Sequence, residues 1–341
     1  MHVEFEVTPG SVVGLTPRSA REVARDCNAA SASDRSRHWI FDYFLARKYP
    51  VPAQYQGDFI GTLMPAHFVE GCWVKDTDGE QPANYPDIDH EYFEWTDLLE
   101  AVFDARGRFT MVELGAGFGR WSARGALAAR RCGIENSRLV MVEGDPAHIE
   151  WLHEYMHLNG ITDYTVFSGA VAAQTESALF VVDVPEGFFS RPGRTNPAAW
   201  YGQSLARSAN LGKAIRTFEI YKGRNVWKVG GDWKAIEIPT FSLSDILAGH
   251  DRVDFVDMDI QGAEGEVIAG SLDLLTARVR RLFIETHSHE IEQWIRADLQ
   301  TAGWYCLRDY PLQTTAQTPF GAISFGGGGL QSWINPRLYQ N

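Results

Sequence analysis

The chain has 341 residues, 45% of them hydrophobic and 12% aromatic, so it can bury a substantial core and is not a disordered chain. Its formal net charge of −13 disfavours a nucleic-acid partner, because binding phosphates requires clustered lysine and arginine. No signal peptide, bilayer-long apolar run or metal-type cysteine spacing is visible, so we expect a cytoplasmic protein with reduced thiols and no membrane span.

The first 104 residues show no regular alternation of strands and helices, which predicts a mainly helical and irregular extension. Apolar residues recur at helical spacing over 36–48, and a second helix is expected to open near His90 and to run to Phe103. We expect this extension to select the substrate or to support a homo-oligomer.

Aromatic and polar residues gather where that second helix opens. Tryptophan and tyrosine faces stack well on the C–H surfaces of a sugar, so His90, Tyr92 and Trp95 are candidates for contacting an acceptor. The alternative is that they pack the extension against the core, and the sequence leaves both open.

From residue 105 onward, apolar strand-like runs alternate with helix-like segments, which predicts an α/β domain over 105–341 with a mostly parallel sheet. The expected strands are 109–113, 138–143, 164–167, 253–259 and 279–286. Helices are expected near 119–131, from just after 144–146 to about 158, after 261–264, and near 290–302. Two later segments, 304–308 and 322–325, are expected to form an antiparallel closing pair.

An insertion over about 185–234 interrupts this pattern. It is rich in glycine, arginine and aromatic residues and has no clear periodicity. A loop of this length in a compact domain is commonly functional, for example as a lid. Trp200 and Tyr201 are therefore further candidates for contacting an acceptor, with packing in the core as the alternative.

A glycine turn follows the first strand, in the sequence FTMVELGAGFGR. A strand that ends in an acidic residue and leads into glycines is typical of class I methyltransferases, which bind S-adenosylmethionine (SAM). We expect Gly115, Ala116, Gly117 and Gly119 to lie along the cofactor and Glu113 to reach its charged amino end. The rival is a dinucleotide fold, but its G-x-G-x-x-G spacing fails because residue 120 is arginine.

Ligands of open α/β sheets bind beyond the carboxyl ends of the strands. Glu143 ends the second strand and is suited to accept hydrogen bonds from the two ribose hydroxyls. Gly169 and Ala170 follow the third strand and leave room for the adenine ring. Asp259 ends the fourth strand and is expected at the same cofactor site.

The segment Asp254–Glu264, DFVDMDIQGAE, resembles the signature of the FkbM family of SAM-dependent methyltransferases, which is close to DFLKIDVEGAE. Two nearby segments strengthen the resemblance. Residues 241–247 look like the family's T-L-D-D-L-L element, and Ile284–His287 looks like its I-E-x-H. The resemblance covers roughly residues 105–310.

This resemblance implies a Rossmann-like class I methyltransferase sheet, mostly parallel with an antiparallel C-terminal strand, and SAM as cofactor. It also implies transfer of a methyl group to a hydroxyl, either of a sugar in a polysaccharide or glycolipid or of a glycosylated natural product. Asp257 stands where the family pattern has lysine and Gln261 where it has glutamate, so the charge at this strand end differs from the family pattern.

An aliphatic hydroxyl is a poor nucleophile, so a base or a metal is expected near the acceptor. In one hypothesis His287 is the general base and Asp259 or Glu285 orients its ring. In another, Asp259, Glu285 and His287 hold a divalent cation such as Mg²⁺, Mn²⁺ or Ca²⁺. A buried polar pair without a catalytic role is the third.

The leading hypothesis for function is a SAM-dependent O-methyltransferase acting on a carbohydrate or glycosylated small molecule. An NAD-dependent oxidoreductase is the first alternative, and the failed glycine spacing counts against it. A catalytically silent SAM-fold module that binds a glycan or a protein is the second, and the altered residues Asp257 and Gln261 keep it open.

Overall fold

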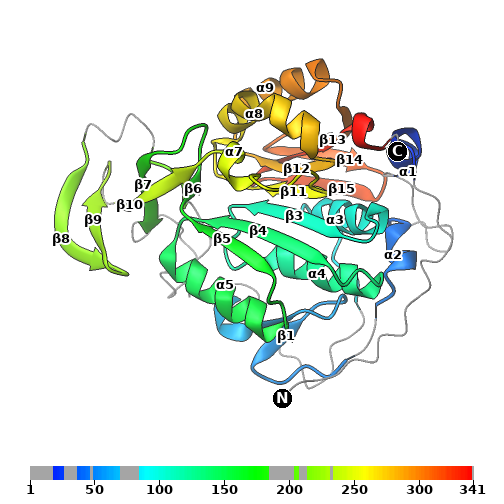
Figure 1. Ribbon diagram of the computed structural model, residues 1–341, viewed down its shortest axis with the longest axis horizontal. Coiled ribbons are helices and arrows are strands. Elements are labelled where there is room, and N and C mark those ends of the chain that lie inside the picture. The colour runs from blue at the N-terminus through cyan, green and yellow to red at the C-terminus, as the bar shows by residue number, and fades with distance from the viewer. Residues whose placement is uncertain are drawn as a thin grey trace.

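A seven-stranded sheet forms the centre of the molecule, in the order β13-β16-β12-β11-β3-β4-β5 (Figure 1). In that order the strands are Tyr305–Tyr310, Gly329–Ile334, Arg281–Thr286, Phe255–Met258, Phe109–Leu114, Ser137–Glu143 and Tyr164–Ser168. All pairings from β12 to β5 are parallel, and β16 is antiparallel to both of its neighbours. The computed structural model describes residues 18–26, 37–46, 49–69, 84–183, 203–206, 213–230 and 233–339.

Helices cover both faces of this sheet because successive side chains along a strand point to opposite faces. The face that carries Met111 packs against α3 (Tyr92–Asp104), α4 (Arg120–Arg131) and α5 (Pro146–Leu158). The face that carries Val112 packs against α7 (Leu243–Ile246), α8 (Glu264–Arg278) and α9 (His289–Thr301). The result is a three-layer α/β/α domain, as the sequence predicted.

A second, five-stranded sheet extends from the β5 end of the central sheet, on the side away from β13 (Figure 1). Its strands are β6 (Ala170–Val171), β7 (Ser177–Asp183), β8 (Ile215–Tyr221), β9 (Arg224–Lys228) and β10 (Lys234–Phe241). We call β7–β10 the insertion arm. The β8–β9 hairpin lies inside the segment for which the sequence showed no periodicity. Its strands are largely exposed, so they carry no apolar alternation that would have revealed them.

The segment before β3 packs on the domain it precedes. It contains α1 (Ala20–Asp26), α2 (Ile40–Tyr43), β1 (Tyr55–Gly57), β2 (Leu63–Pro65), the 3₁₀ turn η1 (Ala66–Val69) and α3. The predicted helix over 36–48 is reduced to the four residues of α2, since Phe44 leaves the helical region at φ −93° and ψ 71°. Ile40, Phe41 and Phe44 share one hydrophobic core with α3 and the sheet.

The predicted antiparallel closing pair was wrong in one partner. β13 pairs with β16, whereas residues 322–325 belong to β15 (Gly321–Phe325), which forms a hairpin with β14 (Thr314–Thr318). All six residues of β16 are buried, and its first residue is the last glycine of the run 326–329. The chain closes with the 3₁₀ turn η2 (Pro336–Tyr339).

Within the described residues, no helix combines the length and the apolar character that crossing a bilayer requires. Cys132 and Cys306 are free thiols, and Cys27 and Cys72 lie outside the described residues.

Candidate active site

Three glycines shape the turn between β3 and α4. Gly115, Gly117 and Gly119 have φ values of 82°, 55° and 76°, in the left-handed region that favours glycine. A Cβ on Gly115 would lie 1.8 Å from the carbonyl oxygen of Asp259, so the turn packs directly on the residue that follows β11. Ala116 is buried, and a Cβ on Gly119 would meet the side chains of two core methionines, Met141 and Met156.

Glu143, at the end of β4, is held in place by backbone donors. The N–H of Gly117 donates to Oε2 and the N–H of Asp145 donates to Oε1, both at 2.7 Å. The residue is 5% exposed, and His148 Nδ1 lies 3.6 Å from Oε1. Each carboxylate oxygen can accept more than one hydrogen bond, so Glu143 keeps the capacity to bind a hydroxyl.

A cleft of about 650 Å³, partly open to solvent, lies against the glycine turn and Glu143. It is lined by Gly115, Gly117, Val142, Glu143, Gly144, His148, Gly169, Ala170, Val171, Phe180, Gln203, Leu205, Asp259, Ile260 and Gln261. Six of the nine residues that the sequence indicated for the cofactor therefore lie at one cleft; Ala116 and Gly119 shape its turn.

Glu113, the ninth residue, does not line the cleft. Its two carboxylate oxygens accept the N–H groups of Trp121 at 3.1 Å and Ser122 at 2.8 Å, in the first turn of α4. Burial raises the pKa of Glu113 to about 7 in spite of these donors. The geometry thus assigns Glu113 to the N-terminus of α4, since both oxygens point there, and not to a ligand's amino group.

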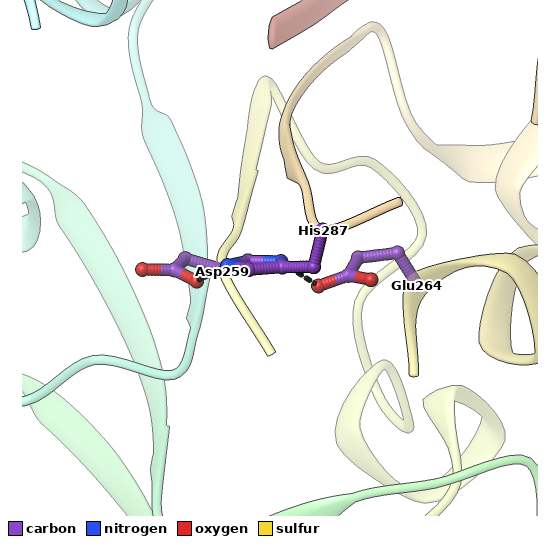
Figure 2. A group of neighbouring side chains, drawn as sticks. All are labelled: Asp259, Glu264 and His287. Carbon is purple, nitrogen blue, oxygen red and sulfur yellow. Dashed lines mark hydrogen bonds and ion pairs between the residues drawn. The ribbon is translucent and has the colours of Figure 1, made fainter. Parts of the chain in front are cut away.

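His287 lies between two carboxylates at the carboxyl ends of β11 and β12 (Figure 2). Its Nδ1 is 2.8 Å from Glu264 Oε1, and its Nε2 is 3.5 Å from Asp259 Oδ1. Glu264 is fully buried at the start of α8 and also accepts the N–H of Gly262 at 3.0 Å. We call Glu264, His287 and Asp259 the histidine chain.

The two carboxylates favour the charged imidazole. Burial acts to lower the pKa of His287, but the hydrogen bond to Glu264 and the charge of Asp259 outweigh burial and raise it to about 9. Burial raises the pKa of Asp259, which the nearby His287 and the amide of Gln261 oppose. The Gln261 amide donates to Asp259 Oδ1 at 2.8 Å from a left-handed backbone at φ 54°.

Glu285 is not a hydrogen-bonded member of the histidine chain, although the charges of Asp259 and His287 act on it. It belongs to a group of three acids that we call the acid cluster: Glu94, Asp257 and Glu285. Burial raises the pKa of Glu285 to about 8, and the charge of Asp259 adds to this. Burial and the charge of Glu113 raise the pKa of Asp257, which shares a hydrogen bond with Glu94. No cation pairs with Asp257 among the described residues, because Arg280 pairs with Asp254 and Arg281 with Asp97 and Glu100.

The metal hypothesis changes with this geometry. Within the described residues, the ligand atoms that lie within 4.8 Å of one another belong to Asp259, Glu264 and His287, so Glu285 is replaced by Glu264. Figure 2 shows the imidazole between the two carboxylates, each facing a different ring nitrogen. An ion bound to one ring nitrogen would leave the other carboxylate across the ring, so the arrangement favours a hydrogen-bonded chain.

The aromatic candidates for contacting an acceptor have different positions. Tyr92 is fully buried and its hydroxyl accepts the N–H of His38 at 2.6 Å. Trp95 is 3% exposed and stacks under the Arg124 guanidinium, 4.1 Å from the ring centroid. For these two the packing alternative holds. His90 is exposed, and Trp200 and Tyr201 lie outside the described residues.

Sequence reasoning missed Glu264 and the contribution of the insertion. Glu264 is the last residue of the DFVDMDIQGAE segment and could have been suspected, because it opens a helix five residues after Asp259. Phe180, Gln203 and Leu205 line the cleft from the insertion and its neighbouring strand, and nothing in their sequence context signals this.

The sequence is similar to known methyltransferases. Residues 113–303 match the family model of the methyltransferase FkbM domain. A proposed methyltransferase of Jannaschia sp. (strain CCS1) is 25% identical over 262 residues, which cover 74% of this chain and 83% of that protein. The family match runs from Glu113 through the cleft and the histidine chain to the end of α9.

Two solved structures are also similar at low identity. Methyltransferase FkbM from Methylobacillus flagellatus KT is 13% identical with a TM-score of 0.36, over 73% of this chain and 55% of that one. An O-methyltransferase from Bacillus cereus in complex with S-adenosylhomocysteine (SAH) is 12% identical with a TM-score of 0.34, over 73% of this chain and 82% of that one.

Proposed function

The chain belongs to the FkbM methyltransferase family, and from this we propose that it is a SAM-dependent O-methyltransferase acting on a hydroxyl of a sugar. The sugar is part of a polysaccharide or glycolipid, or of a glycosylated natural product. Methyltransferase activity follows from the family; the donor, the hydroxyl and the sugar are the proposal. The observation that carries it is the histidine chain beside a cleft that fits the methyl donor.

The residues of the cleft fit SAM. A Cβ at position 115 would collide with the Asp259 carbonyl, so this position requires glycine, and its backbone lines the cleft. Glu143 is fixed by two backbone N–H groups and can accept the two ribose hydroxyls. Gly169 and Ala170 leave space for a flat ring on the far side. Asp259, at the end nearest His287, offers a negative charge toward the cationic end of the donor.

In the bound state SAM supplies a methyl group already activated by its sulfonium. The protein then has to align the acceptor oxygen and take its proton. The Nδ1–H of His287 donates to Glu264, so in the neutral imidazole Nε2, on the Asp259 side, is the nitrogen available as a base. It would take the hydroxyl proton as the acceptor oxygen receives the methyl group, and Asp259 and Glu264 would stabilise the resulting imidazolium.

The acid cluster supports a hydroxyl-bearing acceptor. Glu285 is half-buried, and with its pKa raised to about 8 it is mostly protonated at neutral pH. A protonated carboxyl group both donates and accepts hydrogen bonds, which matches neighbouring hydroxyls of a sugar. Glu94 reaches this cluster from α3, so the segment before β3 contributes to the same end of the sheet and is suited to select the acceptor.

The test is transfer of radiolabelled methyl from SAM to a panel of mono- and oligosaccharides, with matched deoxy sugars as controls. We expect label on at least one hydroxylated acceptor and none on the analogue lacking that hydroxyl. Binding of SAH but not NADH in calorimetry is expected as well. Labelling of amines in preference to hydroxyls would overturn the assignment.

The same assay tests the role of a metal. Because the imidazole separates the two carboxylates, we expect activity to survive exhaustive EDTA treatment within about twofold. Loss of activity that Mg²⁺ or Mn²⁺ restores would replace the base hypothesis by the metal hypothesis.

A further inference from the structure

The insertion arm reaches the cofactor cleft. Phe180, on β7, pairs with Leu205 of the described segment 203–206, and both residues line the cleft. Backbone hydrogen bonds on either side fix this pairing: Val181 N donates to Ser204 O and Ala206 N to Leu179 O, both at 2.8 Å. The arm therefore lines the cleft together with the glycine turn.

The arm also packs on the loop after β4. A Cβ built on Gly144 would lie 2.8 Å from Phe180 Cζ, so the phenyl ring lies flush against the backbone between Glu143 and Asp145. No larger residue fits at position 144 while the ring keeps this place. The position of the arm and the position of the Glu143 loop are thereby mechanically linked.

A continuous chain of hydrogen bonds runs from the arm to the glycine turn. The hydroxyl of Tyr221, at the end of β8, donates to Asp145 Oδ1 at 2.8 Å. The N–H of Asp145 donates to Glu143 Oε1 at 2.7 Å, and the N–H of Gly117 donates to Glu143 Oε2 at 2.7 Å. Three chain segments far apart in sequence meet in this series.

Asp145 is the residue through which the loss of a single hydrogen bond would disturb this series. It is fully buried, and its Oδ1 also accepts the N–H of Ala147 at 2.8 Å to cap α5. Its Oδ2 has no partner within the part of the chain that the structure describes. A buried carboxylate with so few donors depends on each of them, since a lost hydrogen bond there is not replaced by water.

We propose that Tyr221 is a positioning residue for the methyl-donor site, acting through Asp145 on Glu143, so that the insertion arm is a working part of that site. The proposal rests on the proposed function, because it assumes that SAM occupies the cleft. It assigns the arm to donor binding, whereas the sequence suggested a lid for the acceptor.

The experiment is calorimetric measurement of SAH binding to the full-length wild type and to Tyr221→Phe, which removes one hydroxyl. Tyr164→Phe is the matched control: the Tyr164 hydroxyl contacts His153 Nδ1 at 2.9 Å on the exposed side of α5, away from the cleft. We expect Tyr221→Phe to weaken SAH binding roughly five- to tenfold, as for the net loss of one ordinary hydrogen bond. Tyr164→Phe should bind within about 1.5-fold of wild type.

Two further measurements separate positioning from a general loss of structure. At saturating SAM, kcat of Tyr221→Phe should fall less than its SAH affinity, because the reacting groups are untouched. In the double variant with Asp145→Asn, the two losses should be less than additive, since both interrupt one chain.

Unchanged SAH affinity in Tyr221→Phe, or additive losses in the double variant, would overturn the positioning role. Failure of the wild type to bind SAH would instead refute the proposed function, and that outcome is visible before any variant is made.

Discussion

The candidate site has two halves. The donor half is the glycine turn with Glu113 and Glu143, where we propose that SAM binds, and the acceptor half is the histidine chain with the acid cluster, where we propose that the acceptor binds. The two halves satisfy their carboxylates in opposite ways. In the donor half, Glu143 and Glu113 each accept two backbone N–H groups from nearby turns. In the acceptor half, Asp257 shares a hydrogen bond with another acid, Glu94, and one oxygen of the buried Glu264 has no partner among the described residues. These two glutamates of the donor half are satisfied by local backbone, whereas the acids of the acceptor half are satisfied only in part, by one another and by His287.

This difference has a physical origin in how each half is built. Backbone N–H groups at a glycine turn and a helix N-terminus come with the local fold, so a short sequence motif suffices to make them. The acceptor half instead brings side chains together from α3, β11, β12 and α8, and their charges must be balanced by protons or by a bound molecule. The first is expected to hold one constant ligand and the second to be adapted to a particular acceptor.

The most severe test of this division is His287→Ala. Removing the base should lower kcat by roughly 10²- to 10⁴-fold, the range for a general base, while SAH affinity stays within about twofold. His289→Ala is the control, because that exposed histidine pairs with Glu292 outside the histidine chain. Near wild-type turnover would remove His287 from the chemistry, and an equal loss of SAH binding would show that the halves are not separable.

The reciprocal test is Glu143→Gln, which keeps the shape of the side chain but removes its charge. Two charge-assisted hydrogen bonds weaken and the acceptor for the ribose hydroxyls becomes poorer, so SAH should bind about 10- to 100-fold more weakly. At saturating SAM, kcat should change far less. Glu150→Gln, an exposed residue of α5 that pairs with Lys222, serves as the control in the same calorimetric titration.

A finer test concerns pH and Glu264→Gln. The base must be deprotonated, so kcat/KM of the wild type should rise with pH until it levels near the His287 pKa of about 9. Without the Glu264 charge the pKa of His287 falls. The rising limb of kcat/KM should therefore occur at lower pH, and the plateau value should drop about tenfold. Glu266→Gln, exposed on the same helix, should leave the limb in place. A limb unmoved in Glu264→Gln would contradict the role of Glu264.

The sequence predicted most of the fold, and most of the residues expected at the cofactor do line one cleft. The alternating strands and helices predicted after residue 105 were confirmed. The motif residues Gly115, Gly117 and Glu143 lie at one cleft because their geometry is set within a few residues of each. The closing strand β16 was missed because a glycine run at its start hides a fully buried strand.

The acceptor half was predicted only in part. His287 and Asp259 do lie together, but the residue that completes the group is Glu264 and not the expected Glu285. β12 ends at Thr286, and His287 belongs to the turn that leads to Ser288, the N-cap of α9, so its position does not follow from the strand pattern. The prediction that Tyr92 and Trp95 contact an acceptor was wrong, because both are buried in the core. Aromatic content alone does not distinguish a helix face that binds sugar from one that packs in a core.

The smallest expected effect tests whether the acceptor half carries unbalanced charge. The pKa of Glu285 is raised from its ordinary 4.5 to about 8 in the folded protein, so the folded state holds this proton more tightly than the unfolded state. Stability should therefore decline as the pH rises from about 4.5 to about 8. Glu285→Gln removes the titrating group while keeping a polar side chain of similar size.

At pH 8.5 the Glu285→Gln variant should be more stable than the wild type by about 1 kcal/mol, or roughly 1–3 °C in Tm, and this advantage should vanish at pH 5. Glu135→Gln, at an exposed position remote from the site, should show no such pH-dependent difference. Thermal unfolding of the three proteins across this pH range decides the question. A stability advantage that is the same at both pH values would mean that Glu285 acts by packing and not by its charge. The contrast between the two halves of the site would then rest on Glu94 and Asp257 alone.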